Sequence, residues 1–216
     1  MKHIIGIILL VAFGCSVSSQ NEDTEYLKVL AERSEKIVKT LNITDSEKHN
    51  RITKTLTNQY KLLGEINDDF NHKIKVAKEE IKDNTKLEQK NKELYEEKNA
   101  KLYNLQCEFI GNLSANLTND QIESVKDGMT YGVRMVTYKS YNEMIPALKE
   151  DEKRQIYAWL TEAREHAMNA SSSKDKHGWF NKYKGRINNY LSRQGYDIQK
   201  ERKLWEERVK AAGGTL

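Results

Sequence analysis

The sequence predicts an all-α protein in which a long antiparallel helical hairpin is followed by a compact C-terminal helical bundle. Proline occurs once in 216 residues, at Pro146, whereas a turn-rich β fold would need more chain breakers. Charged residues make up 31% of the chain and hydrophobic residues 38%, a balance that suits solvated helices with narrow apolar stripes. Apolar residues recur at helical spacings of three and four along most of the chain.

Residues 1–19 have the features of a signal peptide. A lysine at position 2 precedes an apolar run over residues 4–13, which is too short to span a membrane. Ala12-Phe13-Gly14-Cys15 resembles a lipoprotein box and makes Cys15 the candidate lipidation site, although Ala12 stands where leucine is commoner. Ordinary cleavage near residues 17–19 is the alternative. We therefore expect an exported protein, periplasmic or lipid-anchored to the outer membrane, that touches a membrane only through a lipid on Cys15.

Residues 22–113 are expected to form the hairpin portion. A first helix spans about residues 24–41, and Thr44 with Glu47 then fits a capping box that opens a second helix. Its apolar stripe continues to Ile81, and a polar break at residues 83–85 precedes a third helix of the same kind. Two long stripes joined by a short polar break predict an antiparallel hairpin with a solvated tip near residues 78–92.

Cys107 is the only cysteine expected to remain unmodified after export. It lies near Leu105 and Phe109, so we expect a small buried hydrophobic residue rather than a reactive thiol. A single remaining cysteine excludes an internal disulfide.

Residues 114–216 are expected to form the C-terminal portion, continuous with the hairpin in one structural unit. A second capping box, from Thr118 to Gln121, opens a short helix. Residues 129–138 combine β-branched and aromatic residues with a glycine and are expected to form an irregular or short extended stretch. A short helix ending near Pro146 follows. Three more helices are expected, over about residues 150–170, over residues 174–194, and from Asp197 onward.

No motif in the chain indicates catalysis, a metal or a cofactor. Glu162 and His166 stand four residues apart, as metal ligands can, but no ligand-spacing motif accompanies them. A nucleophile elbow and a glycine-rich phosphate loop are both missing from the sequence. We therefore expect no catalytic residue, no metal ligand and no cofactor, and an enzyme is unsupported rather than excluded.

The best candidate for function is the polar and aromatic segment 177–190. On a helix, Trp179, Lys182, Arg186 and Asn189 fall on one face, beside a second face that is mostly apolar. An exposed tryptophan with flanking amide and cationic groups suits a sugar, because the ring stacks on the pyranose and the polar groups bind hydroxyls or a uronate. In the alternative, Trp179 belongs to the core and Arg186 pairs with a carboxylate.

Three further features of the C-terminal portion bear on this candidate. Gly178 and Gly185 each cost about 1 kcal/mol inside a helix, which suggests close approach by another helix or by a ligand. Tyr131 and His177 complete the candidate set if the 129–138 stretch faces the segment across a shallow cleft. Residues 172–216 hold 11 Lys or Arg against 5 Asp or Glu, which favours acidic partners, although a solvated helix face explains the excess equally simply.

Several long motifs resemble an uncharacterised exported family of Bacteroidota, known as domain of unknown function 3826. The resemblance covers essentially the whole mature chain, and the segments that carry it span residues 121–133, 141–146, 161–168 and 172–201. It implies a sugar-binding protein that works beside polysaccharide-utilisation genes, and the family offers no catalytic residues to transfer. On this basis we expect an exported, non-catalytic polysaccharide-utilisation accessory protein that binds an oligo- or polysaccharide, acidic ones included, and no nucleic acid.

Two other functions remain open from the sequence. The stretch Leu117-Thr118-Asn119-Asp120-Gln121 resembles a motif of periplasmic helical chaperones, which hold unfolded clients on a concave surface. An uncharacterised glycan-processing enzyme is the second alternative. A binding module needs exposed aromatic side chains with convergent amides, whereas an enzyme needs an acid or base of perturbed pKa in a pocket.

Overall fold

The computed structural model describes residues 15–215, and the side chains of residues 24–215. This part of the chain is helical throughout and contains no strand, which confirms the all-α prediction. None of its helices is long and apolar enough to cross a membrane. The expected signal peptide and the lipidation site at Cys15 concern residues or side chains outside the described part. The described helices are α1 (Cys15–Lys39), α2 (Ser46–Glu80), α3 (Asn84–Ser114), α4 (Asn119–Met129), α5 (Val133–Met144), α6 (Glu150–Met168), α7 (Ser173–Arg193) and α8 (Ile198–Ala211).

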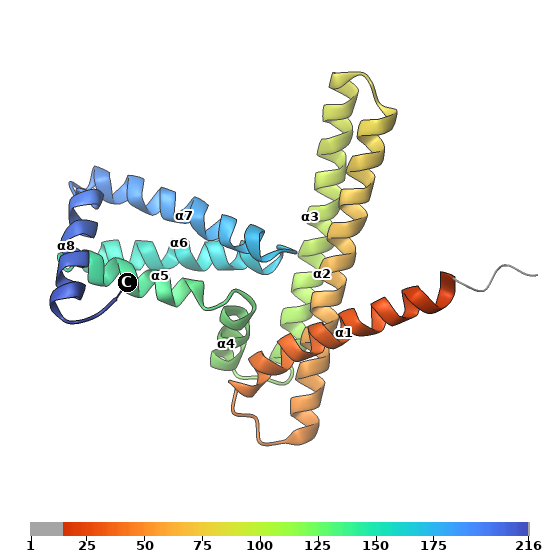
Figure 1. Ribbon diagram of the computed structural model, residues 1–216, viewed down its shortest axis with the longest axis horizontal. Helices are drawn as coiled ribbons and strands as arrows, with labels where there is room; N and C mark the ends of the chain where they lie inside the picture. The colour runs from red at the N-terminus through yellow and green to blue at the C-terminus, as the bar shows by residue number, and fades with distance from the viewer. Residues whose placement is uncertain (1–14, 216) are drawn as a thin grey trace, which may run out of the picture.

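Helices α2 and α3 form the predicted antiparallel hairpin, which Figure 1 shows upright, with α1 crossing its lower half. The N-cap of α2 differs from the prediction by one residue. Asp45, not Thr44, is the N-cap of α2 and accepts a hydrogen bond of 3.0 Å from the backbone N–H of Lys48. Asp83 caps α3 in the same way through Lys86 N–H. A carboxylate both accepts this bond and favours the positive end of the helix dipole, so aspartate replaces threonine as the cap.

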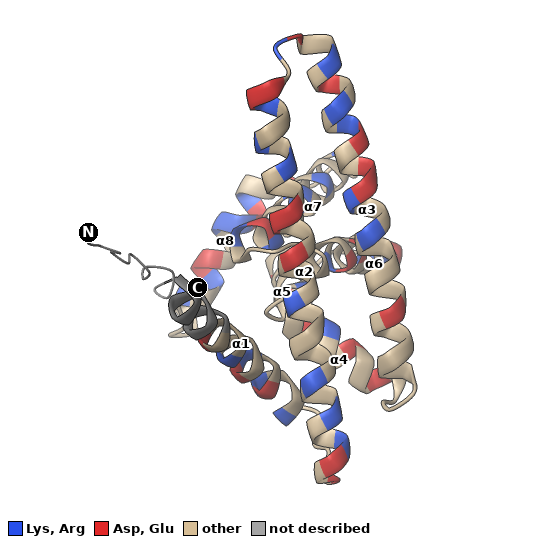
Figure 2. Ribbon diagram, turned by 90° about the vertical axis from the view of Figure 1, so that its right-hand side faces the viewer, with Lys and Arg blue, Asp and Glu red and all other residues tan. Residues whose placement is uncertain are grey.

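Opposite charges alternate along both helices of the hairpin, as Figure 2 shows. Lys73 bridges Asp69 at 3.0 Å on its own helix and Glu97 at 2.8 Å on α3. Lys101 bridges the same two carboxylates, at 3.2 Å to Asp69 and 2.7 Å to Glu97. Each exposed pair is worth little by itself, but the closed four-member network spans both helices and therefore favours one register between them.

The second capping box forms as predicted. It gives the threonine and the glutamine of the chaperone-like stretch 117–121 a local structural role at the start of α4. Thr118 Oγ1 accepts from Gln121 N–H at 3.3 Å, while Gln121 Oε1 accepts from Thr118 N–H at 3.2 Å. Gln121 also donates through Nε2 to the carbonyl oxygen of Leu41 at 3.0 Å. The glutamine thus fixes the start of α4 against the end of α1.

The irregular or extended stretch expected at residues 129–138 is much shorter than predicted. Only residues 130–132 leave the helical conformation, and α5 begins directly at Val133. The chain turns there because Tyr131 and Gly132 both adopt left-handed backbone angles, with φ of 59° and 67°. Buried Arg134 then holds the first turn of α5 against α4 through an ion pair of 2.7 Å to Asp127. Tertiary contacts of this kind override the weak helix propensity of a β-branched segment.

The described residues form three hydrophobic clusters, of which the smallest, Phe70, Ala77 and Leu94, holds the upper hairpin together. The first joins α1 and the lower hairpin to α4, and also takes in Met168 at the end of α6. The second joins α5, α6 and α7, with α8 lying across their far end. Because α6 ends in the first cluster and contributes to the second, it ties the α6–α7 pair to the hairpin.

A buried charge network sits where α6 meets α4 and α5. Arg164, whose side chain is 1% exposed, pairs with Glu123 at 2.8 Å, with Asp127 at 3.1 Å and with Glu165 at 2.8 Å. Removing one partner from such a network leaves buried charges unpaired, so the network fixes how the α6–α7 pair leaves the hairpin. A pocket lies in the angle between them.

Cys107 is exposed, and the prediction of a buried cysteine is wrong. Leu105 and Phe109 face the core, but Cys107 points to the opposite side of α3, where it shares a hydrogen bond with Tyr103. A spacing of two residues turns a side chain by about 200° around a helix, so sequence neighbours of this kind lie on opposite faces.

Candidate ligand-binding pocket

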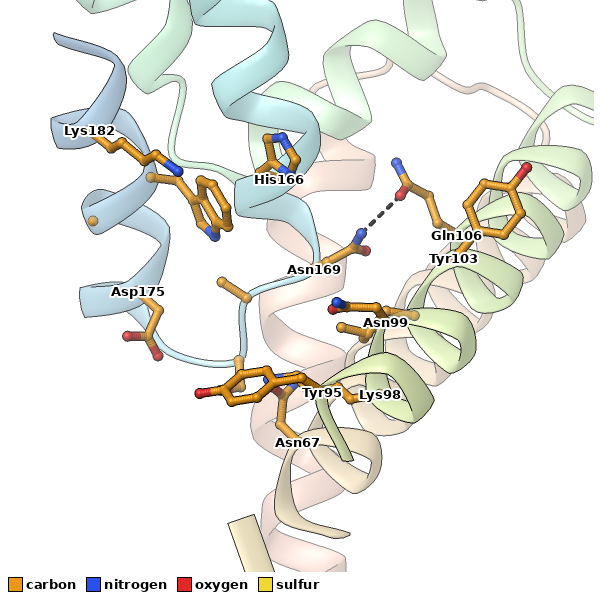
Figure 3. Close-up of a pocket in the computed structure, with 15 residues that line it drawn as sticks. Asn67, Tyr95, Lys98, Asn99, Tyr103, Gln106, His166, Asn169, Asp175 and Lys182 are labelled. Carbon is orange, nitrogen blue, oxygen red and sulfur yellow. Dashed lines mark hydrogen bonds between the residues drawn. The ribbon is translucent and has the colours of Figure 1, made fainter. Parts of the chain in front are cut away.

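The pocket lies between the middle of the α2–α3 hairpin and the adjoining ends of α6 and α7, and has a volume of about 840 Å³. This size is within the usual range for small-molecule sites. Figure 3 shows side chains from α3 and from the α6–α7 pair approaching it from two sides.

The α3 wall is a polar and aromatic stripe. Tyr95, Asn99, Tyr103 and Gln106 follow one another at spacings of four, four and three residues and therefore share one face of the helix, and Lys98 borders this face. Tyr95 is 54% exposed and Tyr103 68% exposed, although large apolar rings are usually covered. Tyr95 is held in place by Phe70, whose ring lies 4.7 Å away at 56°. This wall thus offers two aromatic surfaces that the protein leaves open.

The α6–α7 wall is built around Trp179. Its ring stacks on His166 at 4.3 Å and 12°, and the ammonium group of Lys182 lies 5.0 Å from its centroid. Asn169 and Asp175 complete the wall from the turn and the first part of α7. Helix α7 starts here because Ser172 is its N-cap and accepts from the N–H of Asp175 at 3.0 Å.

A hydrogen-bond chain crosses the pocket and connects its two walls. Asn169 Nδ2 donates to Gln106 Oε1 at 2.9 Å, drawn as a dashed line in Figure 3. Gln106 Nε2 donates in turn to Glu165 Oε2 at 3.3 Å. Glu165 is itself bound by Arg164 and by Lys126. The two amides are therefore oriented by the buried charge network, which pre-organises this part of the pocket.

Other polar groups of the pocket are left for a ligand. Neither Lys98 nor Lys182 forms an ion pair with a carboxylate of the described residues, and each instead lies over an aromatic ring. Burial lowers the pKa of Lys98, and the opposing charge of Asp175, which lines the same pocket, partly restores it. Asn99 lines the same wall with an amide that can donate and accept.

Gly178 keeps the α7 wall open. It lines the pocket, and a Cβ built on it would have no atom within 4 Å. Gly185, two turns further along α7, is equally open but lies outside the pocket. The prediction that another helix approaches these glycines closely is therefore wrong. Approach by a ligand can explain the glycine only at position 178, which lines the pocket.

The structure brings together two of the residues predicted as contacts and places the other four elsewhere. Trp179 and Lys182 line the pocket. Arg186 lies 4.7 Å above the ring of Trp159 and pairs with Glu162 at 3.4 Å, as the alternative interpretation predicted. Asn189 is exposed further along α7, outside the pocket. Only the first part of the face predicted on α7, as far as Lys182, lines the pocket.

Tyr131 and His177 meet each other rather than the pocket. Their rings stack at 5.7 Å and 15°, which brings the α4–α5 corner beside the start of α7. The expected approach of these two segments is therefore confirmed, but the contact lies away from Trp179 and Lys182.

The α3 wall was missed from the sequence, although a signal for it exists. The residues from Tyr95 to Gln106 interleave with the apolar stripe of α3 and border its solvated face, and no binding role is predicted for them from the sequence. A run of tyrosines and amides at helical spacing is unusual on such a face, where lysine and glutamate are typical. His166, considered only as a metal ligand, supports the ring of Trp179 instead. Within the described side chains, no three His, Cys, Asp or Glu groups are placed to hold a metal ion.

Comparison with known protein families shows which family the chain belongs to. A family model matches residues 27–211, which runs from the first part of α1 to the end of α8. The chain belongs to this family, described as Protein of unknown function (DUF3826). The match confirms the resemblance to DUF3826 drawn from the sequence motifs. It includes both walls of the pocket, so the pocket is part of the family domain. A comparison with curated proteins gave no match.

Proposed function

We propose that this protein is an exported, non-catalytic carbohydrate-binding protein and that the pocket between α3 and α7 is its binding site. The observation that carries the proposal is the composition of the walls: open tyrosine rings on one side, a tryptophan on the other, and oriented amides between them. Sugar sites need this combination, because a pyranose has apolar faces for aromatic rings and a rim of hydroxyls for amides.

In this proposal the sugar ring stacks on the two tyrosines of the α3 wall. His166 covers one face of Trp179, and the Lys182 ammonium lies over the ring, so the open aromatic surface belongs to Tyr95 and Tyr103. Trp179 supplies the opposite wall and its indole N–H. Gln106 and Asn169, oriented by each other, and Asn99 then hydrogen-bond the hydroxyls.

The charges of the pocket favour an acidic sugar. Lys98 and Lys182 bring two positive charges to the pocket, against one negative charge from Asp175. A lysine ammonium is a mobile point charge that can leave an aromatic ring to meet a carboxylate. We therefore expect uronate-containing polysaccharides to bind more tightly than neutral ones, and the preference to weaken as salt is added.

Affinity electrophoresis with immobilised polysaccharides tests the proposal. We expect a gel loaded with an acidic polysaccharide to retard the protein, and Trp179→Ala and Tyr103→Ala to lose the retardation. Trp205→Ala is the matched control, because it removes the same side chain from α8, outside the pocket. Tyr103 is exposed, so its replacement leaves the core intact.

Fluorescence gives a second readout of the same site. Trp179 is one of three tryptophans, so a ligand in the pocket changes part of the intrinsic emission, and the change disappears in Trp179→Ala. Unchanged mobility on every neutral and acidic polysaccharide would overturn the proposal, and suppression of client aggregation, the chaperone alternative, would then be measured.

A further inference from the structure

A second, smaller cavity lies on the other side of the α6–α7 turn. It has a volume of about 200 Å³ and is enclosed by α1, α2 and the start of α7. Ala170 and Ser171 line both cavities, so the turn separates them. The carbohydrate proposal makes no use of this cavity.

Two cations line the small cavity without a carboxylate. Lys176 is 3% exposed, and its Nζ donates to the carbonyl oxygen of Ala167 at 3.1 Å, which uses one of its three N–H bonds. Arg33 lies over the ring of Tyr60 at 5.3 Å. Neither forms an ion pair with a carboxylate of the described residues, whereas Lys73 and Lys101 of the hairpin each pair with two carboxylates.

The two positive charges are close enough to repel each other. Burial and, to a smaller extent, the positive charge of Arg33 together lower the pKa of Lys176 to about 8. A buried ammonium without a counter-ion is costly, and a second cation beside it adds to the cost. The nearest acidic neighbour in sequence, Asp175, faces the larger pocket and accepts a hydrogen bond from Ser172. The cavity therefore carries positive charge that no carboxylate of its lining neutralises.

Hydroxyl groups complete the lining. Tyr26, Tyr60 and Ser171 all line the cavity, and each carries a hydroxyl that can donate a hydrogen bond. Gly64 lets Tyr26 approach α2, because a Cβ at this position would lie 2.8 Å from the tyrosine hydroxyl. A concave space with two cations and neutral donors, but no acid, has the chemistry of an oxyanion receptor.

We propose that this cavity binds a small oxyanion, a carboxylate, phosphate or sulfate group, between Lys176 and Arg33. The volume admits one such group or a single sugar acid, not an extended chain. The buried ammonium supplies the charge, Arg33 supplies a planar pair of donors from the rim, and the tyrosine hydroxyls complete the oxygen ligands. This site is separate from the carbohydrate pocket and does not depend on it.

Thermal unfolding of the purified protein in sodium phosphate, sulfate and glucuronate tests the proposal, with sodium chloride at matched ionic strength as reference. We expect a saturable rise in Tm with at least one of the three anions. Isothermal titration with that anion should show an affinity about ten- to a hundredfold lower in Arg33→Gln and in Lys176→Met, since each removes a charged hydrogen-bond partner. Arg33 is exposed, so its replacement does not threaten folding.

The controls separate this site from the carbohydrate pocket and from general salt effects. Trp179→Ala should keep the full anion response, because it alters only the larger pocket. An equal rise in Tm in the wild type, Arg33→Gln and Lys176→Met would show a general salt effect and overturn the proposal. So would the absence of any response beyond that of chloride. The three anions together report whether the site prefers a planar carboxylate or a tetrahedral group.

Discussion

Gly178 and Gly185 form a natural pair for testing where the ligand binds. Both lie inside α7, and a Cβ at either position would meet no atom within 4 Å. Only Gly178 lines the pocket. Substitution at the two positions should therefore change stability equally and binding unequally.

The stability effect follows from helix propensity. Alanine is favoured over glycine inside a helix by about 1 kcal/mol, because glycine loses more backbone entropy on folding. No steric cost opposes the gain at either position, since the space around each Cβ is empty. We expect Gly178→Ala and Gly185→Ala each to raise Tm by about 2–4 °C, the shift that 1 kcal/mol produces in a protein of this size.

The binding effect requires a larger side chain. Gly178→Leu keeps most of the helix gain, because leucine is nearly as good a helix former as alanine. Its side chain projects from the pocket wall into space that the ligand would occupy. A clash of about 1.4 kcal/mol already lowers affinity tenfold, so we expect a loss of at least that size. Gly185→Leu, with the same chemistry outside the pocket, should bind as the wild type does.

Differential scanning calorimetry and affinity electrophoresis on the four variants give both quantities. Wild-type retardation of Gly178→Leu would refute the assignment of the ligand to this pocket. A lower Tm in both alanine variants would refute the reasoning on open space, because it would mean that the glycines are packed against a neighbour.

Two further predictions concern the buried charges. Since burial lowers the pKa of Lys176 from 10.5 to about 8, the unfolded chain binds more protons between these values, and stability should rise with pH across this window. Lys176→Met should remove that rise and stabilise the protein at pH 7 by about 3 kcal/mol, the equivalent of the pKa shift. If the free energy of unfolding in urea changed with pH equally in the wild type and the variant, this prediction would be contradicted. Arg164→Met should destabilise the protein by about 3–5 kcal/mol, because it leaves three carboxylates without their shared partner. A loss of unfolding free energy under 1 kcal/mol in Arg164→Met would show that the network is dispensable. Burial raises the pKa of Glu123, but Arg164 and neighbouring cations lower it more. The wild type should therefore lose stability as the pH falls below about 4.5, and this loss should be smaller in Arg164→Met.

Local signals in the sequence predicted the helices well. The stripes of α2 and α3, the capping box at Thr118 and the helix end before Pro146 are all present in the structure. These features depend on residues within one or two turns, so a single segment contains the information. The stretch at 129–138 was misjudged because Arg134 gains its ion pairs from another helix, and no local pattern shows that.

The candidate site was predicted in part, for the same reason. Segment 177–190 identified Trp179 and Lys182, since a local polar and aromatic face is visible on one helix. Which part of that face meets another element depends on the angle between α7 and the hairpin. The contacts of Arg164 with α4 help to set this angle, and Arg186 and Asn189 fall beyond the crossing.

The sequence by itself determined the helical class of the protein, the order and ends of most helices, and two residues of the pocket, Trp179 and Lys182, because helical periodicity and capping are local. Only the tertiary structure decided that Tyr95 and Tyr103 line the same pocket as Trp179. Likewise, it alone placed Lys176 beside Arg33, with more than a hundred residues between them in the chain. Both arrangements arise from packing between helices that are distant in the chain. The burial and the charge environment of these residues therefore depend on contacts that a local sequence pattern does not show.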